Sequence, residues 1–197
     1  KKGIAGTYRF GIGSNDEFML NLFHLDNHNG INYGMPWLTP EPGATNRVLT
    51  PIDPKNYYGM ASDYNAGTAD YGTLSHLHRF DGESEIKTSY REGRFTRDQR
   101  ASAIRLCQRS VNQATGTVTN PTCPSSVTGA TLNDGTELTR GSNNKTMNLD
   151  TRTLQSDYGG KFVAWGLKHS LLAGIDITSD AFDGYTPMLP TGVTLNK

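Results

Sequence analysis

The segment YGTLSHLHRFDGESEIKTSYREGRFTRD, residues 71–98, reads as two strands folded about a tight turn at Asp81-Gly82. Asp-Gly is a strong hairpin signal because type I′ turns require a positive φ at both central residues. The turn is short, whereas the far ends of both strands run into segments of roughly thirty residues rich in Pro, Gly, Asn and Ser. Short turns at one end of the strands and long loops at the other are typical of outer-membrane barrels.

Alternating apolar and polar residues predict further strands on both sides of this hairpin. Residues 6–13 and 17–29 each carry an apolar face and are joined by a turn at Ser14, and residues 154–164 and 171–178 repeat the pattern around Gly166. We therefore predict an all-β chain with almost no helix, an antiparallel up-and-down segment of a transmembrane β-barrel. About six strands in three hairpins place all three turns at one edge of the sheet.

The composition is compatible with a barrel and excludes other classes. Only 35% of the residues are hydrophobic, the mean hydropathy is −0.57, and no apolar run approaches the ~20 residues of a membrane-spanning helix. Barrel strands need only alternate positions to be apolar. Lys+Arg and Asp+Glu both total 19, so no basic excess points to nucleic acid.

No signal peptide precedes Lys1, and we expect the chain to begin inside a longer precursor.

The first long loop, residues 35–65, contains several prolines, which break sheet and helix patterns. Large aromatic side chains lie within it or beside it, and they allow two readings. Either they pack the loop against itself, or they form a surface that contacts a ligand. These residues are Tyr33, Trp37, Tyr57 and Tyr58.

The second long loop, residues 107–145, contains both cysteines of the chain. In an exported protein, Cys107 and Cys123 most simply form a disulfide, because the loop holds no histidine or further cysteine that would complete a metal site. The Asn133-Asp134-Gly135 turn, flanked by Thr and Leu, predicts a small hairpin within the same loop.

Motifs for catalysis are absent: the chain has no G-x-S-x-G, P-loop, H-E-x-x-H or C-x-x-C pattern, so we expect no catalytic residues and no enzyme activity.

His76 and His78 share one strand face. They are either a possible metal pair or polar histidines that face a barrel lumen. Without a third ligand we expect no metal site. Four basic residues on inward strand faces either form a polar lumen lining, or simply solvate the interior or pair with Glu and Asp. They are Arg9, Lys87, Arg91 and Lys161.

Several segments together resemble consecutive barrel hairpins of TonB-dependent siderophore receptors, especially the catecholate type. They are Tyr57-Tyr58-Gly59 with Asp63-Tyr64, DYGTLSHLHRF (70–80), SYREGRFTRDQR (89–100), RTLQSDYGGKFVAWGLKHSLLAGIDIT (152–178) and NLFHLDNHNGINYGMPWL (21–38). The resemblance implies that residues 1–197 are part of the barrel domain of such a receptor. No plug domain, TonB box or C-terminal aromatic strand end is visible, and the family's plugged barrel has about 22 strands, so we expect the plug and the other strands to lie outside this chain.

The resemblance also implies a function and a location. It implies TonB-dependent, energy-coupled uptake of a ferric siderophore, with iron carried as cargo and no resident cofactor, in the outer membrane of a Gram-negative bacterium. Its partners are then the siderophore, the TonB complex reached through the plug, and outer-membrane lipid. Two alternatives stay open: a TonB-dependent receptor for another ligand, and a non-transporting binding or structural β-sheet protein such as a sandwich. A sandwich gives no reason for all short turns to lie at one end.

A ferric catecholate complex is bulky, aromatic and negatively charged, so its site needs aromatic faces and cationic donors at the outer mouth of the barrel. Arginine suits this ligand because its planar guanidinium both hydrogen-bonds oxygens and stacks on rings. Strand polarity brings the aromatic residues of the first loop to that mouth, beside the arginines of the neighbouring strand. The predicted siderophore-binding residues are Tyr33, Trp37, Tyr57, Tyr58, Arg94, Arg97 and Arg100.

Overall fold

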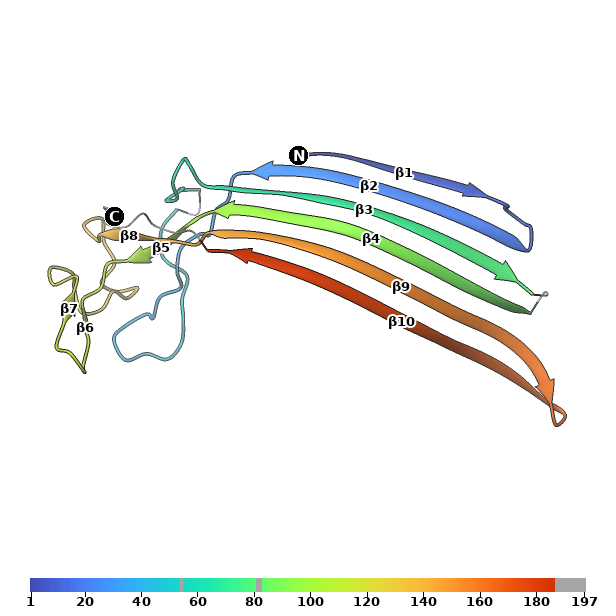
Figure 1. Ribbon diagram of the computed structural model, residues 1–197. Helices are drawn as coiled ribbons and strands as arrows, with labels where there is room; N and C mark the ends of the chain where they lie inside the picture. Colours follow the sequence, from blue (N-terminus) through green and yellow to red (C-terminus); the bar gives the residue numbers. More distant parts are fainter. Residues whose placement is uncertain (54, 81–82, 187–197) are drawn as a thin grey trace. The chain divides into compact units, whose positions relative to one another are not determined.

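A computed structural model describes residues 1–53, 55–80 and 83–186. It divides into two compact units, each described by itself: a sheet unit of residues 1–29, 66–98 and 145–186, and a loop unit of residues 30–65 and 99–144. Six long strands form one sheet in the order β1-β2-β3-β4-β9-β10 (Figure 1). Their bounds are β1 Lys2–Phe10, β2 Asp16–Asn29, β3 Tyr64–Arg79, β4 Ser84–Arg100, β9 Lys145–Ala164 and β10 Leu167–Tyr185. The predicted fold class is confirmed: neighbouring strands run antiparallel, and no described residue is helical.

The strand ends that flank the three hairpin connections lie along one edge of the sheet (Figure 1). Trp165 and Gly166 both have positive φ, 52° and 75°, as a two-residue hairpin turn requires. The Asp81-Gly82 turn falls outside the described residues, but β3 and β4 end on either side of it. The Arg79 N–H donates to the Asn15 carbonyl at 2.7 Å, and the Lys161 N–H donates to the Glu83 carbonyl at 3.0 Å. These bonds join the flanks of all three connections, so the predicted edge is confirmed.

The strands extend further from this edge than their apolar patterns indicated. β3 begins at Tyr64 rather than near Tyr71, and β9 begins at Lys145 rather than near Leu154. In these added segments both faces are largely polar, so no alternation marks them in the sequence. Backbone hydrogen bonds between neighbouring strands do not depend on side-chain polarity, and the ladder therefore continues beyond the apolar region.

The register between β9 and β10 gives the sheet one apolar and one polar face. Ile177 lies opposite Leu154, Ala173 opposite Tyr158 and Leu171 opposite Gly160. On the other face, Asp176 lies opposite Gln155. Because directly opposed residues of an antiparallel pair point to the same side, the predicted division is confirmed for this hairpin. We call the two sides of the whole sheet its apolar face and its polar face.

The loop unit has its own small core and two short strand pairs. β5 (Ser102–Leu106) pairs with β8 (Leu138–Ser142), and β6 (Ser110–Val111) pairs with β7 (Val118–Thr119). Cys107 and Cys123 form the predicted disulfide. The buried apolar residues of this unit are Leu38, Ala101, Ile104, Cys107, Cys123 and Val127. The disulfide therefore belongs to the core of the loop unit.

The hairpin predicted around Asn133-Asp134-Gly135 is wrong. The segment does turn, with the Thr136 N–H donating to the Asn133 carbonyl at 2.9 Å. The strand that follows, β8, pairs with β5 instead of with the residues just before the turn. The turn residues thus predicted the local bend correctly, but the strand after the turn pairs with β5, which is distant in sequence, and not with the residues just before the turn.

No helix among the described residues is long and apolar enough to cross a membrane.

The two faces of the sheet predict opposite responses to a new charge at the same depth. Ile175 is 59% exposed on the apolar face, and Gln155 lies beside it on the polar face. If the apolar face contacts lipid, Ile175→Arg destabilises the full-length protein by about 2–4 kcal/mol, whereas the matched change Gln155→Arg costs much less. Chemical denaturation in lipid bilayers measures both values. Equal losses for the two variants would contradict the assignment of the faces.

Candidate functional site

An aromatic band crosses the apolar face close to the hairpin edge. Phe10 stacks on Phe18 with ring centroids 4.9 Å apart, and Phe18 stacks on His76 at 4.3 Å. Further along, His78 meets Phe80 edge-on at 4.7 Å, and Phe80 lies 6.3 Å from Tyr158. The band therefore runs from β1 to β9. Aromatic rings gathered at one level are typical of the girdle that a barrel places at the membrane interface.

The two histidines of this band do not face the polar side, so the reading of His76 and His78 as lumen-facing residues is wrong. Their neighbours Phe18 and Phe80 belong to the apolar face. Asp16, the first residue of β2, hydrogen-bonds both rings, at 2.8 Å from His76 Nε2 and 2.7 Å from His78 Nδ1. Sequence reasoning missed this third partner because it lies 60 residues from His76 and only strand pairing brings it close. We call these three residues the turn-edge triad.

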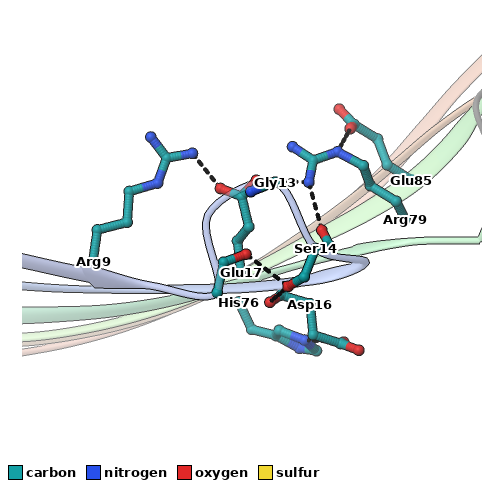
Figure 2. A network of polar contacts seen from close by, with 9 residues as sticks. Arg9, Gly13, Ser14, Asp16, Glu17, His76, Arg79 and Glu85 are labelled. Atoms are coloured by element: carbon teal, nitrogen blue, oxygen red, sulfur yellow. Dashed lines mark hydrogen bonds and ion pairs between the residues drawn. The ribbon is translucent and has the colours of Figure 1, made fainter.

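A charged network occupies the opposite, polar face at the same end of the sheet (Figure 2). Glu17 is its centre, with a side chain only 5% exposed. Its carboxylate accepts hydrogen bonds from the Arg9 guanidinium, from Arg79 Nη1 at 2.7 Å and from the Gly13 N–H at 3.0 Å. Arg79 also donates to the Ser14 carbonyl at 3.0 Å. Arg9 is therefore paired with an acid, which is the second of the two readings offered for the basic residues.

A cluster of aromatic rings and one arginine lies further along the polar face. Phe23 of β2 stacks on Tyr71 of β3 at 4.7 Å, and Phe95 of β4 lies 6.4 Å from Tyr71. The Arg91 guanidinium carbon sits 4.0 Å from the centre of the Tyr71 ring, a cation–π contact. We call these four residues the Tyr71 cluster. Sequence analysis named only Arg91, because Phe23, Tyr71 and Phe95 are spread over three strands and no local pattern links them.

Two of the four predicted aromatic ligand residues have hydroxyls engaged in packing the loop unit. The Tyr33 hydroxyl accepts a hydrogen bond at 2.9 Å from Gln99, which is 1% exposed. The Tyr57 hydroxyl lies 3.2 Å from the Ile31 carbonyl and 3.0 Å from the Met60 carbonyl. These contacts match the first reading of the aromatic residues, in which they pack the loop against itself.

The other two aromatic residues, Trp37 and Tyr58, line a cavity of about 310 Å³ in the loop unit. Trp37 is 59% exposed, and Arg140 Nε donates to the Tyr58 carbonyl at 2.8 Å. Met35, Pro36, Leu49 and Ile52 add apolar walls, and the polar lining comes from Asn32, Thr50, Asp53 and Asn56. An apolar hollow with a few polar groups is the usual form of a small-molecule site. The second reading, a ligand-contact surface, is thus retained for Trp37 and Tyr58.

The three predicted arginines do not gather on one side of their strand. Arg94 lies on the apolar face, with Nε 3.8 Å from Asp150 Oδ1. Strand alternation puts Arg97 on the opposite face, with Phe95. Arg100 is the last residue of β4 and belongs to the loop unit. The role of all three in binding a ligand stays a prediction.

Comparison with known proteins agrees with this geometry. No family model matches the chain. Over 190 residues, 93% of the chain, it is 26% identical to the catecholate siderophore receptor Fiu of Escherichia coli O157:H7 and 25% identical to Fiu of E. coli K12. The chain spans about a quarter of the length of these relatives, 23% of each.

Solved structures of similar fold include two receptors. The closed form of the ferric-catecholate import receptor Fiu from E. coli K12 matches 93% of the chain with a TM-score of 0.69 and 23% identity, over 25% of the Fiu chain. The siderophore receptor PiuA from Acinetobacter baumannii matches 92% with a TM-score of 0.70 and 18% identity, over 23% of its chain.

The fold is therefore that of a segment of a siderophore-receptor β-barrel. The chain is homologous to the Fiu catecholate siderophore receptors, which confirms the resemblance seen in its strand patterns. All of these proteins are named as receptors, in agreement with the expectation that this chain is not an enzyme.

The Glu17 network predicts a graded loss of stability on the polar face. Glu17→Ala removes a carboxylate that is only 5% exposed and that accepts hydrogen bonds from both Arg9 and Arg79. Glu85→Ala is the matched control, because Glu85 is 54% exposed and contacts Arg79 only at 3.8 Å. We expect the melting temperature of the full-length protein in detergent to fall clearly for Glu17→Ala and little for Glu85→Ala. A Glu85→Ala loss as large as that of Glu17→Ala would contradict this ranking.

Proposed function

We propose that residues 1–197 are part of the barrel domain of an outer-membrane receptor that takes up a ferric siderophore, most specifically a catecholate, in a Gram-negative bacterium. Homology to receptors named for catecholate siderophores over 93% of the chain carries this proposal. The iron enters as cargo within the siderophore, and the barrel segment needs no resident cofactor. The proposed uptake is energy-coupled and depends on the TonB complex of the inner membrane.

The two faces of the sheet suit the two surroundings that this function requires. The apolar face presents Ile175, Ile177 and Leu154 to the lipid, with the aromatic band at the level of the interface. The polar face, with the Glu17 network and the Tyr71 cluster, lines the barrel interior. In the Glu17 network, arginines and acids face each other, and the Arg91 guanidinium with its aromatic neighbours adds a cationic and aromatic surface to the interior.

Within the loop unit, the Trp37 and Tyr58 cavity is the proposed place of siderophore contact. An aromatic catecholate ring stacks on aromatic side chains, and Trp and Tyr are among the residue types that dominate binding hot spots. Asn32, Thr50 and Asn56 offer hydrogen bonds to the ligand's polar groups. Tyr33 and Tyr57 then act mainly by holding the loop in shape, through their hydroxyl contacts. Arg97 and Arg100 stay separate proposals for cationic contacts of the chelate, whereas Arg94 lies on the apolar face beside Asp150.

Siderophore binding is tested by removing the cavity aromatics in the full-length receptor. We expect Trp37→Ala and Tyr58→Ala to weaken binding of ferric catecholates by about 1–3 kcal/mol each, roughly fivefold to 150-fold, as hot-spot residues do. Trp165→Ala is the matched control, because Trp165 is 93% exposed in the hairpin turn of the sheet unit. Fluorescence quenching titrations measure the affinities.

Arg97→Ala belongs to the same series. If this variant binds ferric catecholates more weakly, β4 also contributes to binding. Correct barrel assembly is confirmed first by heat-dependent mobility in detergent. Unchanged affinity in Trp37→Ala, Tyr58→Ala and Arg97→Ala together would move the ligand contacts outside this chain.

Energy coupling is tested separately by measuring uptake of radiolabelled iron from ferric catecholates. Cells that carry the receptor but lack TonB should bind the siderophore at the surface and accumulate no iron. Cells with TonB should do both, because the release of a tightly bound ligand into the periplasm requires energy. Equal accumulation with and without TonB would contradict the proposed coupling, and absence of catecholate binding in both strains would favour a receptor for another ligand.

A further inference from the structure

The turn-edge triad brings three metal-ligating side chains together on the apolar face, and no step of the proposed uptake uses them. Asp16 Oδ1 lies 2.8 Å from His76 Nε2 and 2.7 Å from His78 Nδ1. The ligand atoms of the three residues all lie within 4.8 Å of one another. Figure 2 shows the Asp16 carboxylate beside His76 at the connection between β1 and β2. The inference that follows does not rest on the siderophore proposal.

The local structure holds each of the three groups in place. His76 and His78 are two residues apart on β3, so strand alternation points both rings to the same face. The His76 ring stacks on Phe18 at 4.3 Å, and the His78 ring meets Phe80 edge-on at 4.7 Å. These contacts restrict ring rotation, which lowers the entropy that binding an ion costs.

The turn before Asp16 positions the third ligand. The Ser14 hydroxyl oxygen lies 2.6 Å from the Asp16 carbonyl and 2.7 Å from the Gly11 carbonyl, close enough to donate its single proton to either. Gly11 has a φ of +71°, and a Cβ there would lie 2.2 Å from the Asp16 carbonyl oxygen, so this tight geometry requires glycine. A compact turn thus delivers the Asp16 carboxylate to the two imidazoles.

We propose that the turn-edge triad binds a divalent transition-metal ion of the zinc type. Two imidazole nitrogens and one carboxylate oxygen suit Zn²⁺, whereas Ca²⁺ and Mg²⁺ prefer oxygen ligands throughout. Three protein ligands leave a fourth tetrahedral position for water. The side chains are 33–50% exposed, and their place in the aromatic band beside the hairpin edge lets an ion reach them from the aqueous side of the membrane interface.

The triad accepts the ion after its ligand atoms adjust their spacing. Ligands about 2.0–2.1 Å from a tetrahedral zinc lie roughly 3.4 Å from each other. The Asp16 contacts of 2.7 and 2.8 Å must therefore open by roughly half an ångström. Asp16 is half exposed, so its carboxylate can rotate, and the two ring nitrogens, which lie within 4.8 Å of each other, must come to the same spacing. The bound ion would link β2 to β3 next to the hairpin edge.

The other comparable cluster among the described residues lacks the necessary chemistry. Cys107, Cys123 and Glu137 also bring their ligand atoms within 4.8 Å of one another. Both sulfurs are joined in the disulfide, however, and only a thiolate is a good metal ligand. The turn-edge triad is therefore the cluster on which the experiment is based.

The test measures zinc binding by isothermal titration calorimetry of the full-length receptor, purified in detergent without a polyhistidine tag. We expect His76→Ala and His78→Ala each to lower the affinity of one zinc site by at least about tenfold, since even outer-shell partners of a metal contribute about 10–100-fold. His24→Ala is the matched control: His24 hydrogen-bonds Asp70, and neither belongs to a cluster of three metal-ligating groups among the described residues. It should bind zinc as the unaltered protein does.

Two further variants separate ligation from a structural effect. His78→Cys keeps a zinc ligand and should retain binding that His78→Ala loses, and Asp16→Asn should weaken binding while keeping the shape of the side chain. Replacing zinc with Co²⁺ should give tetrahedral visible absorption bands that vanish in His76→Ala. The inference is overturned if the unaltered receptor, His76→Ala and His78→Ala bind zinc equally, if none binds it, or if His24→Ala loses binding to the same extent.

Discussion

The cross-strand register of the long antiparallel sheet is the constraint on which everything else in the sheet unit depends. In the hydrocarbon of a membrane no water satisfies the backbone, so each strand must pair with its neighbours along its whole apolar length. Once the register between β9 and β10 sets Ile177 opposite Leu154, every other residue of both strands is assigned to a face. A shift of one residue would bring Gln155 and Asp157 to the lipid and Leu154 and Tyr158 to the interior.

Near the hairpin edge, the cross-strand register places a different polar network on each face of the sheet. On the polar face, the buried Glu17 carboxylate serves two arginines and a backbone N–H, and Glu85 supplies a second acid beside Arg79 where the chain turns. On the apolar face, the adjacent residue Asp16 points the other way and meets His76 and His78 among aromatic rings. Two consecutive acids of one strand thus take part in two separate networks, because successive side chains alternate across a sheet.

The loop unit is ordered by different interactions, because no lipid contact imposes a two-residue alternation of apolar and polar side chains on it. Its order comes from a small apolar core that includes the Cys107–Cys123 disulfide, from the β5–β8 pair, and from buried polar groups. Asp63 accepts hydrogen bonds from the Ser102 backbone and hydroxyl, both at 3.0 Å. Such contacts join segments from both long loops, and they leave Trp37 and Tyr58 free to line a cavity. A loop held at several points by polar contacts combines a defined shape with a surface for a ligand.

The sequence alone determined the features that depend on neighbours in the chain. Alternation predicted the strands and their apolar sides, the short connections predicted a single hairpin edge, and the isolation of Cys107 and Cys123 predicted their disulfide. The tertiary structure decided what depends on residues far apart in the chain: the partner of β8, the polar lengths of β3 and β9, the opposite faces of Arg94 and Arg97, and the meeting of Asp16 with His76 and His78. The physical reason is that side-chain direction repeats every two residues within one strand, whereas the register between strands is set by pairing energies summed over the whole ladder.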